Sequence, residues 1–178
     1  MKKLIYTIIF GMTILLTSCK KNGPVVIDSI PPIIGFTISG GGFSKTFNGT
    51  EDYTIGQLNL KPNTKYTVNL SINDTGGVSR LQMQLDKILL SQTITGIPPV
   101  TETETILQKI YSIFGVSTNP YTSFLITGFL VTPDAIPSVD NFFDIKTNGR
   151  DYTPNIVSIH VPCLISQTPP GGYGWFVP

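Results

Sequence analysis

The chain has few charged residues, a single histidine and two cysteines. Charged side chains make up 13% of its 178 residues, about half of the usual share of roughly 25%. The formal net charge is +1, and a nearly neutral chain lacks the basic surface with which proteins bind nucleic acid. Zinc needs several His, Cys or carboxylate ligands close together, and no Asp-x-Asp spacing typical of calcium loops occurs. These shortages argue against a nucleic-acid partner, a metal site or a bound cofactor.

The same shortages leave little material for catalysis. His160 and Cys163 lie three residues apart in an alternating segment, which places them on opposite faces of a strand and prevents a nucleophile–base pair. Cys163 is predicted to be a buried thiol. Glu102 and Glu104 are interpreted as a solvated strand edge rather than as the paired carboxylates of a glycosidase. Gly40–Gly42 lacks the lysine of a phosphate-binding P-loop. The sequence predicts a non-enzyme, with a hydrolase of unrecognised type as an alternative.

Residues 1–18 have the organisation of a cleaved leader. Lys2 and Lys3 form a positive start, Leu4–Leu16 is a nearly unbroken apolar run, and a short segment of small residues closes it. A membrane-spanning helix needs about 20 apolar residues, and this run has about thirteen. A retained transmembrane anchor is therefore disfavoured. An ordinary secretory signal, in which the cysteine at the cleavage site has no role, is the other alternative.

The closing residues resemble the lipobox of bacterial lipoproteins; they are Leu16, Thr17, Ser18 and Cys19. The resemblance implies recognition of the first three by a signal peptidase, cleavage before Cys19, and attachment of palmitate-like acyl chains there. Stable anchoring takes more than one acyl chain, a condition that a triacylated cysteine meets. Leader and tether together resemble those of Bacteroidota lipoproteins, which implies anchorage to the outer membrane of the cell envelope. Lys20 and Lys21 replace the acidic residues often associated with surface export, so the periplasmic and surface-facing leaflets both remain open.

After a tether of residues 19–30, residues 31–178 predict one all-β domain. About 160 residues follow the leader, enough for a single core. Tyr66–Asn73 alternates strictly between apolar and polar residues, and Val78–Leu85 alternates again after the turn at Asp74–Gly77. Asn148–Gly149 is interpreted as a hairpin turn. Further strands are expected at Ile33–Ser39, Thr54–Leu60, before Pro98, at Tyr121–Val131, Phe142–Lys146 and Ile156–Ile165.

One segment has the spacing of a helix. In Thr103–Phe114, apolar residues recur at helical intervals, and Thr103 is suited to cap the first turn. Its many β-branched residues lower the helix propensity, so a strand is the alternative. We expect a short helix inserted here into an otherwise β-domain.

Three short motifs resemble those of immunoglobulin-like domains in bacterial cell-surface proteins. Residues 28–34 carry the paired prolines that precede a first strand, residues 72–78 carry an Asp-x-Gly-Gly-Val turn, and residues 147–150 precede a late strand. The resemblance implies an antiparallel immunoglobulin-like β-sandwich. Such domains run to about 100 residues, so the excess length is assigned to the region around the expected helix.

The Pro- and Gly-rich tail supplies the candidate binding residues. Tyr173, Trp175 and Phe176 are candidates for stacking on sugar rings, and equally for packing into the core. Asp28–Ile30 also resembles the O-glycosylation motif of exported Bacteroidota proteins, which makes Ser29 a candidate acceptor. The sequence therefore predicts a membrane-anchored envelope lipoprotein that binds or scaffolds a protein or glycan without catalysis. A glycan-binding surface lipoprotein that uses exposed aromatics is the alternative.

Overall fold

The chain forms an all-β domain, as predicted. The computed structural model describes residues 29–133, 141–153 and 155–178, and within these ranges it contains strands and no helix. The leader residues 1–18, Cys19 and the tether as far as residue 28 lie outside the described residues. The strands within these ranges are β1 (Ile33–Gly40), β2 (Phe43–Asn48), β3 (Gln57–Leu60), β4 (Lys65–Asp86), β5 (Ser91–Ile97), β6 (Thr101–Glu104), β7 (Gln108–Phe114), β8 (Tyr121–Val131), β9 (Asn141–Asp151), β10 (Ile156–Ile165) and β11 (Gly174–Phe176).

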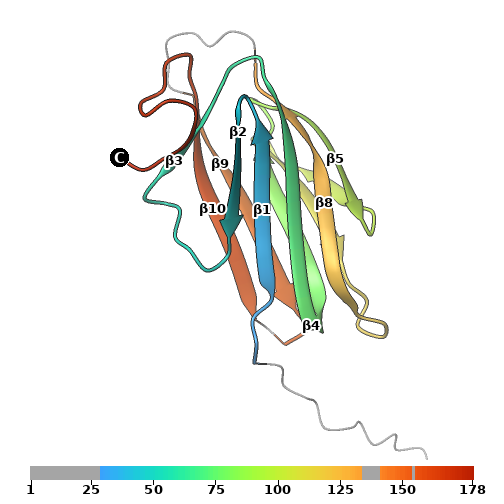
Figure 1. Cartoon of the computed structure of the whole chain (residues 1–178). Helices are drawn as coiled ribbons and strands as arrows, with labels where there is room; N and C mark the ends of the chain where they lie inside the picture. Colours follow the sequence, from blue (N-terminus) through green and yellow to red (C-terminus); the bar gives the residue numbers. More distant parts are fainter. Residues whose placement is uncertain (1–28, 134–140, 154) are drawn as a thin grey trace, which may run out of the picture.

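The 22-residue strand β4 organises the sheet because it folds back on itself. Its first half pairs with β1 and β8, and its second half pairs with β7 and β9. The bend is the predicted turn at Asp74–Gly77, where Gly77 has a φ of 99° that only glycine adopts without strain. Figure 1 shows β4 reaching the lower end of the molecule and returning behind itself.

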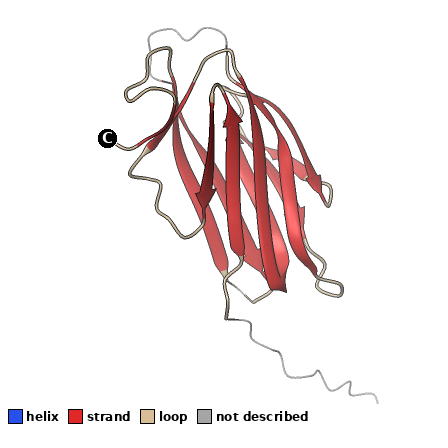
Figure 2. Ribbon diagram, viewed as in Figure 1, coloured by secondary structure: helices blue, strands red, loops and turns tan. Residues whose placement is uncertain are grey.

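The bend turns one continuous sheet into two facing layers (Figure 2). One layer runs β2-β1-β4-β8-β5, and the other runs β11-β3-β10-β9-β4-β7-β6. The folded sheet is nearly closed, because β2 approaches β11 on one side and β5 approaches β7 on the other. Apolar side chains from both halves of β4 fill the space between the layers, among them Leu70, Ile72, Leu81 and Met83.

The predicted helix at Thr103–Phe114 is wrong, because the segment forms the hairpin of β6 and β7. The backbone N–H of Gln108 donates to Thr105 Oγ1 over 2.9 Å and so closes the turn. Ile106 is 88% exposed in that turn, although it contributed to the helical spacing. Tyr111 and Ile113 alternate into the core instead. Strand propensity of the β-branched residues and cross-strand burial outweigh the local helical pattern.

The prediction of a purely antiparallel sheet is also wrong at one place. β3 pairs with β10 in parallel, so the sheet is mixed. β11 then adds to the other edge of β3 in the antiparallel sense. The side chain of Asn59 in β3 is fully buried, and its Nδ2 donates to the carbonyl oxygens of Pro170 (2.6 Å) and Gly172 (2.9 Å). A polar core residue thereby ties the Pro- and Gly-rich tail to the sheet.

Most other strand predictions are confirmed within a few residues. The boundaries of β8 and β10 agree with the predicted Tyr121–Val131 and Ile156–Ile165. The hairpin predicted at Asn148–Gly149 is formed by β9 and β10, but its turn lies farther along the chain, because β9 continues through both residues to Asp151. Cys163 is confirmed as a fully buried thiol. Among the residues described, none forms a helix long and apolar enough to cross a membrane.

Candidate functional site

Several connections gather at the end of the domain where the chain enters β1, here called the tether end. It comprises the Asp74–Gly77 turn, the 115–120 connection between β7 and β8, and the described part of the 152–155 connection between β9 and β10. Pro120 packs over Gly77, and the Tyr152 ring approaches both Gly77 and Gly115. These contacts hold connections from both layers together beside the start of β1 (Figure 1).

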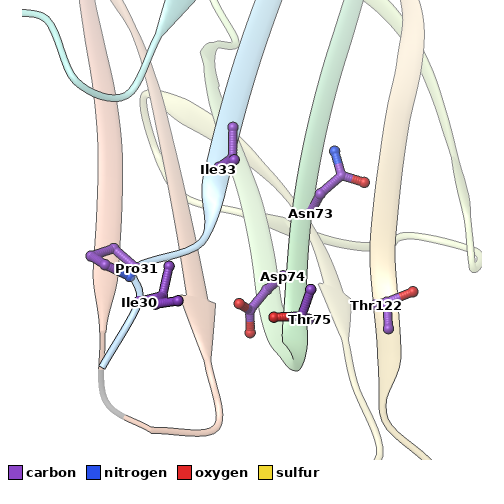
Figure 3. A pocket seen from close by; sticks show the side chains of 7 residues that line it. All are labelled: Ile30, Pro31, Ile33, Asn73, Asp74, Thr75 and Thr122. Atoms are coloured by element: carbon purple, nitrogen blue, oxygen red, sulfur yellow. The ribbon is translucent and has the colours of Figure 1, made fainter. Parts of the chain in front are cut away.

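A shallow groove opens at the tether end (Figure 3). Its volume is about 280 Å³. One wall is the approach to β1, with Ile30, Pro31 and Ile33, and the other is the bend of β4 with Thr122 of β8 beyond it. Ile33 is 74% exposed, so the groove has an apolar rim. Ser29, the candidate glycosylation residue, is exposed just before it.

Two arginines lie side by side on the outer face of the second layer, close to the tether end. Arg80 of β4 and Arg150 of β9 are directly opposite each other in the antiparallel register. Directly opposed residues project to the same face of a sheet, with Cβ atoms about 4.5–5.5 Å apart. They are the only two arginines in the sequence. The sheet therefore pairs two like charges that are far apart along the chain.

A β-bulge gives Arg80 its outward direction. The register shifts between Val78 and Arg80, which leaves Ser79 as the extra residue. Val78 and Leu81 are both fully buried, a combination that strict alternation forbids for residues three apart. Ser79 Oγ donates to the carbonyl oxygens of Arg150 (3.0 Å) and Asp151 (2.5 Å) and so fixes the bulge. Bulges are frequent where a side chain must be redirected at a functional site.

Neither arginine of the pair has an ion-pair partner in the described part of the chain, because neither lies within ion-pair distance of Asp or Glu there. Arg80 Nη2 donates to Asn148 Oδ1 over 3.1 Å. Asp151 follows Arg150 and is 2% exposed. It accepts hydrogen bonds from Thr153 Oγ1 (3.1 Å) and from the backbone N–H of Asn155 (3.0 Å). These hydrogen bonds stabilise its charge.

A cavity of about 360 Å³ borders both arginines and the buried Asp151. Phe114 lies directly opposite Arg80 on β7 and is 56% exposed. Tyr152 forms another wall, and burial raises the pKa of its hydroxyl. Guanidinium groups donate several N–H groups in a planar fork suited to oxyanions. The arrangement is chemically able to bind an anion beside an apolar ring.

The three aromatic residues of the tail differ in their exposure. The Trp175 ring lies edge-to-face against Phe47 and Tyr53, with ring centroids 5.2 and 5.6 Å away. Lys45 Nζ covers the indole, 5.8 Å from its centroid. Phe176 is half-buried, whereas Tyr173 is 39% exposed. Tyr173 is therefore the most accessible of the three candidate sugar contacts.

The remaining candidate groups form solvated polar contacts. Glu102 and Glu104 project from the edge strand β6 and bind Lys109 Nζ at 2.7 and 3.1 Å. Their carboxylates raise the pKa of Lys109. His160 Nε2 lies 3.0 Å from Asp144 Oδ1. Within the described ranges, no group of three or more His, Cys, Asp and Glu side chains is placed to hold a metal ion.

Comparison with known proteins adds no relative. No protein-family model matches the chain, and no curated protein sequence matches it.

The sequence analysis missed the arginine pair. The bulge that turns Arg80 outward and the register that brings it beside Arg150 are tertiary features. The one available signal was the use of only two arginines in the chain, against ten lysines.

Proposed function

We propose that the chain is a lipid-anchored cell-envelope protein whose β-domain binds or scaffolds a partner without catalysis. The observation that carries the proposal is the Leu16–Cys19 lipobox, placed directly before a short tether and a domain that begins at one end of the fold. Ser29 lies ten positions after Cys19, and such a segment reaches at most about 35 Å. The lipid would therefore hold the tether end of the domain near the outer membrane.

Metabolic labelling with a clickable palmitate analogue tests the anchor. The wild-type chain should take up the label and fractionate with membranes, because the acylated cysteine is its anchor. A Cys19→Ala variant should lose both properties. A Cys163→Ala variant is the matched control, since Cys163 is buried in the core, and it should keep the label. An unlabelled wild-type protein would contradict the proposal.

The relationship to immunoglobulin-like domains belongs to the same proposal. Such domains arrange strands A-B-E-D in one sheet and C-F-G in the other. Here β1, the first half of β4, β8 and β5 follow the first order, and the second half of β4, β9 and β10 follow the second. These pairings support the relationship, with β2, β3, β6, β7 and β11 as additions. An experimental structure in which β5 does not pair with β8 would remove this support.

Glycan capture by the tail is the second candidate, favoured by the exposed ring of Tyr173. Affinity electrophoresis in gels containing envelope polysaccharides should show retardation of the wild type. The Tyr173→Ala variant should lose it, because the exposed ring supplies the stacking surface. Trp175→Ala needs a parallel unfolding curve, since its ring packs on Phe47 and Tyr53. Unchanged retardation in Tyr173→Ala and in a folded Trp175→Ala protein would remove the idea.

Modification of Ser29 is part of the proposal as well. Ser29 is exposed at the start of the described domain, so a glycosyltransferase would have access to it. Intact-mass spectrometry of protein purified from its own envelope should show a glycan mass that disappears in Ser29→Ala. A bare polypeptide mass in the wild type would contradict this assignment.

A further inference from the structure

The pairing of the chain's only two arginines has no structural explanation within the sheet. Like charges placed directly opposite each other on neighbouring strands destabilise a sheet. The chain has ten lysines, any of which would serve as a solvated surface charge. Arginine nevertheless occupies both of the paired positions, 80 and 150, on the outer face of the second layer. A bulge at Ser79 is needed to turn Arg80 outward. We propose that Arg80 and Arg150 form a binding site for a phosphate-class anion.

The hydrogen-bonding capacity of the pair defines the ligand. Each guanidinium carries five N–H donors in a rigid plane, and Arg80 directs Nη2 to Asn148, which leaves further donors on both side chains. A carboxylate has only two oxygens, and a bidentate pair with one guanidinium engages both of them. A phosphoryl group has three or more oxygens and can accept from both forks at once. Its charge also offsets the repulsion between the two arginines.

The surroundings of the pair leave both arginines without a carboxylate partner among the described residues. Asp151 also lines the cavity, but it is 2% exposed and its carboxylate is held by Thr153 and Asn155. Asp144, farther along β9, lies between His160 and Lys146 at 3.0 and 3.3 Å. Phe114 provides an exposed apolar surface beside the 360 Å³ cavity. The site is thus a positive patch with room for a phosphorylated group that carries an organic part.

Two sources can supply such a phosphate. One is a soluble or polymer-bound phosphoryl group, and the other is the headgroup of an anionic lipid. The arginines lie close to the tether end, where β4 restarts at Val78 and β9 ends at Asp151. Exposed Ile156 is directly opposite Arg150 on β10, and Phe114 is directly opposite Arg80 on β7. The two arginines therefore have an apolar neighbour on each side. The experiment below separates the two sources.

The full lipidated chain in an uncharged maltoside detergent is the material for the test. Sodium phosphate is titrated against sodium chloride of equal ionic strength, with thermal unfolding and the arginine Nε–H signals in NMR spectra as readouts. Phosphate should raise the melting temperature and shift the signals of Arg80 and Arg150, because a ligand that binds only the folded state stabilises it. The absence of both effects would overturn the proposal.

Variants assign the effect to the pair. Arg80→Gln/Arg150→Gln should weaken phosphate binding by about tenfold to a hundredfold, the value of one or two charged hydrogen bonds. The same variant should melt at a higher temperature than the wild type in chloride, because the like-charge repulsion is gone. Arg80→Lys/Arg150→Lys keeps the charge but loses the forks and should bind more weakly. Lys61→Gln/Lys65→Gln removes equal charge just before and at the start of β4, away from its bend, and should bind normally. Equal loss in this control would overturn the site.

Nanodiscs distinguish the sources. With phosphatidylglycerol in the bilayer, arginine signals that shift without added phosphate identify a headgroup ligand. Shifts with free phosphate only, in either phosphatidylglycerol or phosphatidylcholine discs, identify a soluble ligand. Both outcomes support the site, and no response in any arm overturns it.

Discussion

Gly149 of β9 lies against Ile72 of β4 across the two layers. A Cβ built on Gly149 would lie 2.3 Å from Ile72 Cδ1 and 3.4 Å from Ile34 Cδ1. The glycine therefore serves close packing of the layers and is not part of a turn. It lies within strand β9, two residues before its end, where glycine normally weakens pairing.

We expect Gly149→Ala to destabilise the domain by about 1–3 kcal/mol, the usual cost of overpacking a close-packed core. Urea unfolding followed by circular dichroism measures the change. Ser158→Ala on the adjacent strand β10 is the control, because Ser158 is exposed and pairs with Asn148. Equal stability of Gly149→Ala and the wild type would show that the two layers can accommodate a Cβ at this point.

Trp175 should matter for stability far more than Tyr173. Loss of the indole leaves a gap beside Phe47 and Tyr53, and truncation of a large aromatic costs about 3–5 kcal/mol when it is fully buried. Because Trp175 is half-buried, we expect about 2–3 kcal/mol. Tyr173→Ala removes one exposed hydrogen bond, from its hydroxyl to the Gln167 carbonyl at 2.6 Å. Its unfolding free energy should change by less than about 1 kcal/mol. The reverse order would contradict the packing.

Asp144 should contribute a small acid-sensitive part of the stability. Partial burial raises its pKa, but hydrogen bonds from His160 and Lys146 outweigh burial and lower the pKa overall. A lowered pKa in the folded state stabilises the protein above the unfolded value of about 3.9, and this contribution is lost as the pH falls through the folded pKa.

Asp144→Asn should therefore flatten part of the decline in unfolding free energy below about pH 4. The carboxylate is 38% exposed, so the effect should stay under about 1 kcal/mol. Asp52 and Glu104, whose pKa values are also lowered by hydrogen bonds, leave a residual decline in the variant. Urea unfolding at pH 3, 4 and 6 provides the comparison, and an unchanged slope would remove the role of Asp144.

Cys163 should be inert in the folded protein. Burial raises the pKa of its thiol well above the ordinary value, and only the thiolate is a strong nucleophile. Reaction with a disulfide reagent should be slow in buffer and should accelerate with urea as the core opens. Rapid modification without denaturant would mean that β10 opens locally, since the side chain is fully buried.

The alternation of single strands was predictable, whereas features set by more distant contacts were not. Tyr66–Asn73 and Tyr121–Val131 carry their own period of two, and the structure confirms both strands. Thr103–Phe114 carries a helical spacing that becomes a hairpin once Tyr111 and Ile113 can be buried. Local pattern decides a segment only where tertiary packing agrees with it.

The glycines show the same limit. Asn148–Gly149 has the composition of a turn, but a neighbour more than seventy residues away, Ile72, requires glycine there. Asp74–Gly77 has a similar composition and does form the predicted bend, helped by the positive φ of Gly77. The arginine pair could not be predicted from the sequence either, because the two residues come together only through the register of β4 and β9.

The position of β11 has a consequence for the order of assembly. β3 lies between β10 and β11, so a strand early in the chain obtains both of its neighbours from segments much later in the chain. This edge of the sheet can form only when both later segments are available, and contacts of such long range make folding slow.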